Sequence, residues 1–153
     1  MEYESRRSVT ETQAGELSTR PWVELFHSTG STDEQPRLAN RLQDAVERGT
    51  VRTFDMFRCG DCASGPTGRP QRSVQALLQR RYRAFQRWAD EHNRELVGFE
   101  REQVSSMLTG EPGERIVFPD STLAEYRNGK LTFVAPSRGE SGLTTPLDRV
   151  RTY

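Results

Sequence analysis

The sequence predicts an α+β fold, a two-layer sandwich in which two helices cover one face of a mixed β-sheet. Two segments, between Thr32 and Gly49 and at residues 71–93, carry apolar residues at helical spacing, and the segments around them are rich in β-forming residues. An Asn-Gly pair at residues 128 and 129 between two apolar runs predicts a tight hairpin. The order of these segments is β-α-β-α followed by an antiparallel β-meander.

The first strand is predicted at residues 22–28, directly after a proline. In an extended chain Val23 and Leu25 lie on one face and Trp22 and Phe26 on the other. Since both faces carry apolar side chains, we expect this strand to be buried in part on both sides.

The first helix is predicted to begin at Thr32, which together with Gln35 fits a capping box, and to end before Gly49. Its apolar stripe follows the helical period at Leu38, Leu42, Ala45 and Val46. A second strand follows at residues 50–57. Because a single helix joins the two strands, we expect them to be parallel, as in a β-α-β unit.

The second helix is predicted at residues 71–93, after a loop at 59–70 that is rich in glycine and proline. Its apolar residues keep helical spacing over about six turns. They are Val74, Leu77, Leu78, Phe85, Trp88 and Ala89.

Two antiparallel hairpins are predicted after this helix. The first joins strands at residues 99–108 and 114–118, and the second turns at Asn128 and Gly129. A two-residue type I′ turn fixes the register of the second hairpin. The predicted pairs are Arg127 with Lys130, Tyr126 with Leu131 and Ala124 with Phe133.

Polar composition sets the predicted domain boundaries. Residues 1–20 and 138–153 hold few apolar side chains, so their burial cannot offset the entropy lost on ordering. We therefore expect a flexible N-terminal tail at 1–20, a single α+β domain at 21–137 and a flexible C-terminal tail at 138–153.

The balance of acidic and basic residues excludes a strong electrostatic field around the whole protein. The 22 acidic and 22 basic residues cancel, so net charge does not direct the chain to nucleic acid or to an anionic surface. No apolar run approaches the roughly 18 to 20 residues of a membrane span, and the acidic first residues do not resemble a secretory signal. The sequence predicts a cytoplasmic protein without membrane contact.

The two cysteines, Cys59 and Cys62, have the C-x-x-C spacing of half a zinc site or of a redox pair. A structural zinc needs four ligands, and the remaining soft donors, His27 and His92, stand alone on different predicted elements. We expect no cofactor, with zinc at the cysteine pair as the alternative. Neither histidine lies in a recognisable acid–base arrangement, so no catalytic residue is predicted.

Arginines on the second helix are the candidate nucleic-acid contacts. Arg80, Arg83 and Arg87 line one face of this helix, and together with Arg81, beside Tyr82, they could present a basic stripe to a DNA or RNA backbone. The competing interpretation is a solvated outer face, since Asp90 and Glu91 dilute the charge at the end of the helix.

The chain resembles a family of small uncharacterised haloarchaeal proteins that are often labelled helix-turn-helix domain proteins. The resemblance is based on the segments Val23–Leu25, Phe85–Ala89, Leu108–Glu111, Leu123–Tyr126 and Leu131–Pro136, with Gly129 between the last two. The resemblance implies a cytoplasmic archaeal protein linked to transcription. It implies no catalytic residue in this chain. Since a strand separates the two predicted helices, we do not expect them to form a compact helix–turn–helix unit.

The predicted sheet has one uncovered face, with Trp22, Phe26 and Leu123 as its candidate exposed residues. Such a face invites association with a protein partner or a second copy. We therefore expect a non-enzymatic regulatory or adaptor domain that acts by protein association. The alternatives are DNA binding through the arginine-rich second helix and an enzyme whose site is assembled from scattered residues.

Overall fold

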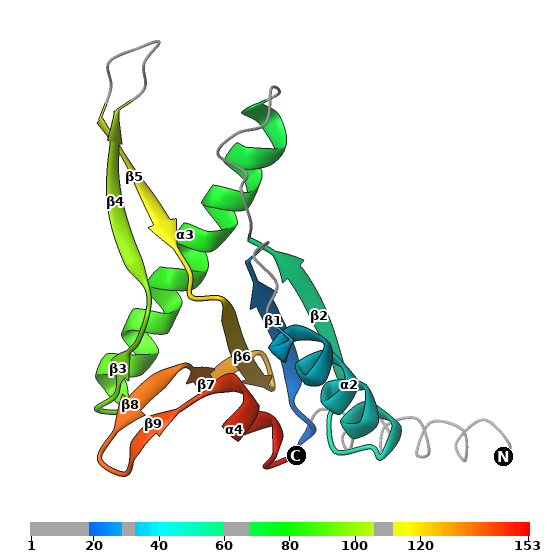
Figure 1. The fold of residues 1–153 in the computed structure, drawn as a ribbon. Helices are drawn as coiled ribbons and strands as arrows, with labels where there is room; N and C mark the ends of the chain where they lie inside the picture. The colour runs from blue at the N-terminus through cyan, green and yellow to red at the C-terminus, as the bar shows by residue number, and fades with distance from the viewer. Residues whose placement is uncertain (1–18, 29–32, 60–67, 106–111) are drawn as a thin grey trace, which may run out of the picture.

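The computed structural model describes residues 19–28, 33–59, 68–105 and 112–153 (Figure 1). Its elements are β1 (Trp22–His27), α2 (Glu34–Glu47), β2 (Thr53–Arg58), α3 (Gly68–Glu91), β3 (Glu95–Leu96), β4 (Glu100–Ser105), β5 (Pro112–Val117), β6 (Ser121–Arg127), β7 (Lys130–Ala135), β8 (Ser137–Gly139), β9 (Gly142–Thr144) and α4 (Pro146–Val150). The predicted α+β class is confirmed. The predicted N-terminal tail lies outside the described residues except for its last two.

The main sheet has four strands in the order β2-β1-β6-β7. Strands β1 and β2 are parallel, as predicted for strands joined by one helix, and β6 lies antiparallel to β1 on its other side. Strand β7 pairs with β6 and forms the far edge. The sheet is therefore mixed, with β1 and β6 at its centre.

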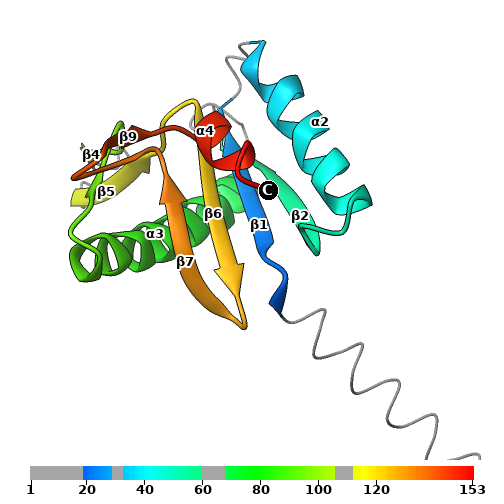
Figure 2. The same ribbon diagram turned by 90° about the horizontal axis from the view of Figure 1, so that it is seen from below.

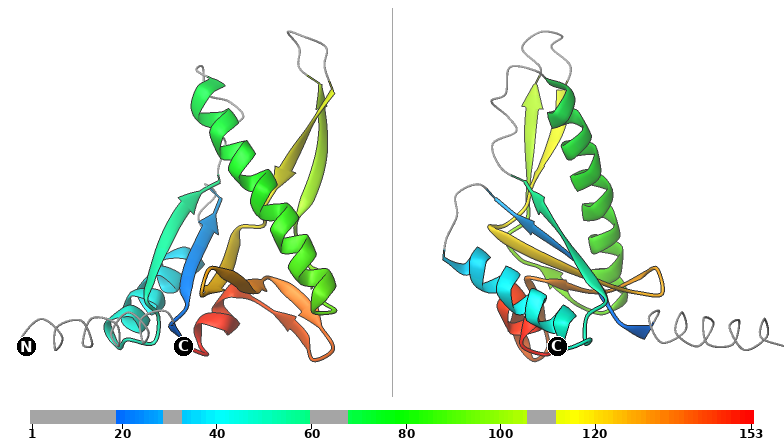
Figure 3. Two further views of the ribbon diagram at one scale, coloured as in Figure 1. Left: turned by 180° about the vertical axis from the view of Figure 1, so that it is seen from behind. Right: turned by 90° about the vertical axis from the view of Figure 1, so that its right-hand side faces the viewer.

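The predicted continuous meander is wrong. Strands β4 and β5 pair with each other in a separate two-stranded sheet, and β3, β8 and β9 form a third sheet. Between β5 and β6 the chain buries Phe118 in the core and passes through Pro119, which cannot donate a ladder hydrogen bond. The β4–β5 hairpin consequently leaves the main sheet and runs beside α3 (Figure 3).

The two long helices lie on opposite faces of the main sheet, which corrects the prediction that both cover one face (Figure 2). Side chains of α2 and α4 pack on one face, in a group we call the α2-side cluster: Val23, Leu25, Leu38, Leu42, Ala45, Val51, Leu123, Ala135 and Val150. Side chains of α3 and β5 pack on the other, in the α3-side cluster: Phe26, Leu78, Phe85, Trp88, Ala89, Ile116, Phe118, Ala124 and Val134. The domain therefore has three layers.

The face of the main sheet that was predicted to be exposed is covered by side chains of other elements. Phe26 and Leu123 are fully buried, and Trp22 is half-buried beside Tyr126, with 4.9 Å between the ring centroids. The central strands carry apolar side chains on both faces, as is typical of strands covered on both sides. The exposed face on which the expectation of protein association depended is thus covered.

The Asn-Gly turn forms as predicted, with positive φ at both Asn128 and Gly129. The first two pairs of the hairpin also form as predicted. Between Glu125 and Tyr126 the register then shifts, so Ala124 pairs with Val134 instead of the predicted Phe133.

The start of α2 differs from the predicted capping box. Thr32 lies outside the described residues, and Asp33 occupies the N-cap position without a side-chain hydrogen bond to the helix. The Gln35 side chain instead donates to the carbonyl of Ser28 at 2.9 Å. The first turn of α2 is therefore tied to the end of β1.

Residues 138–153 pack on the domain instead of forming the predicted flexible tail. A capping box starts α4, because Thr145 and Asp148 each accept a hydrogen bond from the other's backbone N–H. Val150 is buried in the α2-side cluster. A few apolar side chains thus suffice to anchor a segment whose composition is mostly polar.

Candidate functional site

Three arginines form an outward-facing row on α3, which we call the arginine row: Arg80, Arg83 and Arg87. All three are exposed, and none has an ion pair or hydrogen bond within the described part of the chain. Their spacing of three and four residues places them on one side of the helix. The structure therefore brings together the three residues that the sequence singled out.

The neighbouring Arg81 points about 100° away from Arg80 around the helix and reaches the sheet. Its guanidinium donates two hydrogen bonds of 2.8 Å to the carboxylate of Glu24 on β1, which is 1% exposed. These hydrogen bonds raise the pKa of Arg81. Burial, with the Glu24 carboxylate nearby, also raises the pKa of Tyr126.

This buried pair fixes the rotation of α3 about its own axis. Because Arg81 is held against the sheet, the row that begins at Arg80 must face away from it. Arg81, grouped with the basic stripe from the sequence, instead binds Glu24, for which no role was predicted. The sequence held one indication of this pair: the acidic residue Glu24 stands between the apolar residues Val23 and Leu25 in a buried strand.

The β4–β5 hairpin holds a second side of α3. Arg101 lies 5.2 Å from the ring of Tyr82 and donates a hydrogen bond to Gln86. Farther along, Gln79 donates to the carbonyl of Glu114 at 3.0 Å. With the sheet on one side and the hairpin on another, α3 presents its arginine row on the side that is left.

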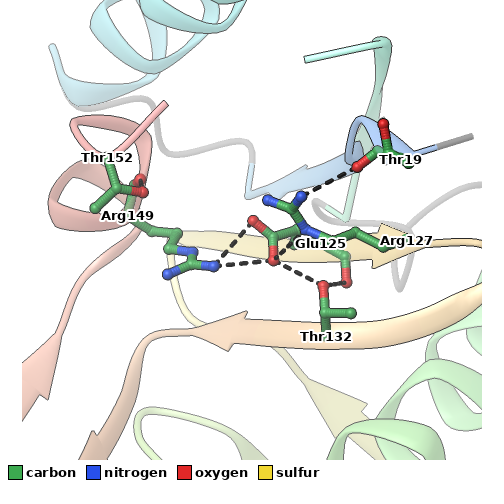
Figure 4. Close-up of polar contacts among 6 residues, drawn as sticks. All are labelled: Thr19, Glu125, Arg127, Thr132, Arg149 and Thr152. Carbon is green, nitrogen blue, oxygen red and sulfur yellow. Dashed lines mark hydrogen bonds and ion pairs between the residues drawn. The ribbon is translucent and has the colours of Figure 1, made fainter. Parts of the chain in front are cut away.

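A second buried carboxylate, Glu125 on β6, anchors the C-terminal segment (Figure 4). Arg149 on α4 donates hydrogen bonds to both of its oxygens, at 3.0 and 2.9 Å, and Thr132 donates one at 2.7 Å. The Arg149 guanidinium also lies 4.2 Å from the ring of Phe133. The register shift in the β6–β7 hairpin is what places Thr132 beside Glu125.

These contacts make the stability of the domain depend on pH. Burial alone would raise the pKa of Glu125, but the hydrogen bond from Thr132 and the pairing with Arg149 hold it below the ordinary value of 4.5. Glu125 therefore contributes stability that is present above the unfolded-state pKa and is lost as pH falls through the lower, folded-state pKa. We expect Glu125→Gln to lose less stability than wild type between about pH 6 and 3 in urea unfolding.

The matched control for this prediction is Glu102→Gln, which removes an exposed carboxylate without a partner in the described chain. It should leave the pH dependence unchanged. An acid-induced loss of stability in Glu125→Gln equal to that of wild type would contradict the assignment.

The other residues named from the sequence lie apart from the arginine row. His92 packs on Trp88, with 5.2 Å between the ring centroids, and its Nδ1 lies 2.8 Å from the Trp88 carbonyl. Cys59 packs against the α3-side cluster, and Cys62 lies outside the described residues. The described residues contain no group of three or more metal-ligating side chains. Because Cys62 lies outside them, the zinc hypothesis stays a prediction.

A protein-family model described as "Helix-turn-helix domain" matches residues 11–153, which is nearly the whole chain. The search of curated proteins found no match, and neither did the search of solved structures. Within the described residues, no helix is long and apolar enough to cross a membrane.

The described helices do not form a compact helix–turn–helix unit, as expected from the intervening strand. Helices α2 and α3 are separated in sequence by β2 and in space by the main sheet (Figure 2). In a helix–turn–helix motif a turn of three or four residues joins two helices that pack on each other. Any contact with nucleic acid through α3 would therefore use this helix without α2 beside it.

Proposed function

Because the chain belongs to the helix-turn-helix domain family, we propose that it is a regulatory domain that binds duplex DNA through the arginine row of α3. The observation that carries this proposal is the row itself. Arg80, Arg83 and Arg87 are exposed and have no acidic partner in the described chain. Guanidinium groups are well suited to phosphate, because their planar fork can donate two parallel hydrogen bonds.

The dimensions of the row suit one DNA strand. From Arg80 to Arg87 the helix rises seven residues, or about 10 Å. Three long arginine side chains displayed over this length can each reach a separate phosphate of one strand. Contacts of this kind position a protein on DNA without reading its sequence.

The packing of α3 supports the proposal. The Glu24–Arg81 pair holds one side of the helix and the β4–β5 hairpin holds another, so the three arginines are displayed from a helix of fixed orientation. Presentation from a rigid element reduces the entropy lost on binding. The balanced net charge predicts that the contact is local and of modest affinity.

The test is the salt dependence of binding to a duplex of arbitrary sequence, measured by fluorescence anisotropy with the full chain. Three phosphate contacts predict that affinity falls about 40-fold between about 50 and 200 mM salt. The double variant Arg83→Gln/Arg87→Gln should reduce the slope of log affinity against log salt by about 2.

The control is Arg37→Gln/Arg41→Gln, which removes two exposed arginines at the same spacing from α2 on the opposite face of the sheet. This pair should leave both affinity and slope unchanged. The proposal fails if the two double variants weaken binding equally, or if wild type shows no binding at low salt.

A further inference from the structure

A hollow of about 580 Å³ lies where β1 and β2 end and α2 begins. His27 and Arg58 line it from the last positions of the two strands, with Met56 beside them. Asp33, Pro36 and Ala39 line it from the first turns of α2. In sheets of parallel strands joined by helices, the crevice at the carboxyl ends of the strands is a frequent ligand site.

His27 supplies a buried polar group without a partner in the wall of this hollow. Its side chain is 6% exposed, and its Nδ1 has no hydrogen-bond partner within the described part of the chain. Buried polar atoms are nearly always hydrogen-bonded in folded proteins, so this exception at a residue that lines a hollow points to a ligand group.

The charges around the hollow define the chemistry of that ligand. Arg58 is exposed without an ion pair in the described chain, and the first backbone N–H groups of α2 add a partial positive charge. Asp33 places a carboxylate at the same rim, where it can accept a hydrogen bond but repels a bare anion. The side chains of Met56 and Pro36 offer apolar contact between these polar groups.

We propose that this hollow binds a small molecule that carries an oxyanion, a phosphate or a carboxylate, together with a hydroxyl or amino group. Arg58 and His27 bind the oxyanion, and Asp33 accepts a hydrogen bond from the hydroxyl or amino group. The site lies on the α2 side of the sheet, away from the arginine row. It is therefore independent of the proposed DNA contact and goes beyond it.

The experiment is an NMR titration of the full chain at constant ionic strength with three probes: inorganic phosphate, ribose 5-phosphate and serine. At least one probe should cause saturable shifts of the His27 ring and Arg58 side-chain signals. Shifts with ribose 5-phosphate alone assign a phosphate ligand, and shifts with serine alone assign a carboxylate ligand.

Two exposed arginines provide matched variants that do not disturb the core. Arg58→Gln should weaken binding of the responding probe by about tenfold or more, because it removes a charged hydrogen bond. Arg138→Gln, at an exposed position on β8, should leave binding unchanged.

The proposal is overturned if none of the probes shifts His27 saturably, or if Arg58→Gln binds as wild type does. It is also overturned if the shifts are confined to Arg20 and Arg52, which line a separate hollow with Trp22 and Tyr126 at the other end of β1.

Discussion

Replacing Phe26 with alanine should lower the free energy of unfolding by about 3 to 5 kcal/mol. Phe26 is fully buried at the centre of the main sheet. Its ring centroid lies 5.0 Å from that of Phe57, 5.3 Å from that of Phe118 and 6.3 Å from that of Phe85. Alanine would leave a cavity among three rings that β2, α3 and the β5–β6 connection hold in place. Urea unfolding monitored by circular dichroism measures the change.

Met56→Ala is the control for this substitution, because Met56 is 45% exposed on the neighbouring strand. We expect this variant to change the free energy of unfolding by less than about 0.5 kcal/mol. A loss below about 1 kcal/mol in Phe26→Ala would mean that the ring is not enclosed in the α3-side cluster.

A double-mutant cycle extends this prediction to the three-layer arrangement. Phe26→Leu and Phe85→Leu fall in the same cluster and should couple by about 0.5 kcal/mol or more. Phe26→Leu and Leu42→Val lie in clusters on opposite faces of the sheet and should add within about 0.5 kcal/mol. Equal coupling in both cycles would place α2 and α3 on the same face.

Replacing Arg149 with alanine should lower the free energy of unfolding by about 3 kcal/mol. The substitution removes both Arg149 hydrogen bonds to Glu125, a carboxylate that is 1% exposed and cannot be solvated without opening the packing of α4. Arg127 and Thr132 remain beside the carboxylate, which holds the expected loss at the lower end of the range for a broken buried pair.

Arg151→Ala is the matched control on the same terminal segment. The Arg151 side chain is 56% exposed, and its ion pair with Asp148 is long, at 3.8 Å. Exposed pairs contribute little, so we expect a change below about 0.5 kcal/mol in urea unfolding. Equal effects of the two substitutions would show that Glu125 does not depend on Arg149.

Local sequence signals predicted the two long helices, the four strands of the main sheet and the β4–β5 hairpin. The helical period of Leu38 and Leu42 predicted α2, and the Asn128–Gly129 pair predicted the β6–β7 turn with its first two residue pairs. These features depend on residues that are near one another in the chain. The same locality explains why the arginine row was identified from spacing alone.

The layer in which α3 packs could not be predicted in this way. Both helices have apolar stripes, and either stripe could cover either face of the sheet. The deciding signal was the apolar character of both faces of β1, with Leu25 on one and Phe26 on the other, which requires a cover on each side. Burial of β1 on both sides was predicted, but the third layer that it requires was not.

Features that depend on a single polar side chain were also missed. The register shift at Glu125 accompanies the contacts of that carboxylate with Thr132 and Arg149, which no local pattern indicates. The C-terminal helix was readable from Thr145 and Asp148, which fit a capping box, but the polar composition around them obscured it.

The most direct test of the proposed function maps the DNA contact on the protein. Amide and arginine side-chain NMR signals of the full chain are followed while a short duplex is added at low salt. We expect the largest shifts at Arg80, Arg83 and Arg87 and on the exposed side of α3, with little change at Arg37 and Arg41 on α2. Shifts centred on α2, or spread evenly over both layers, would contradict it.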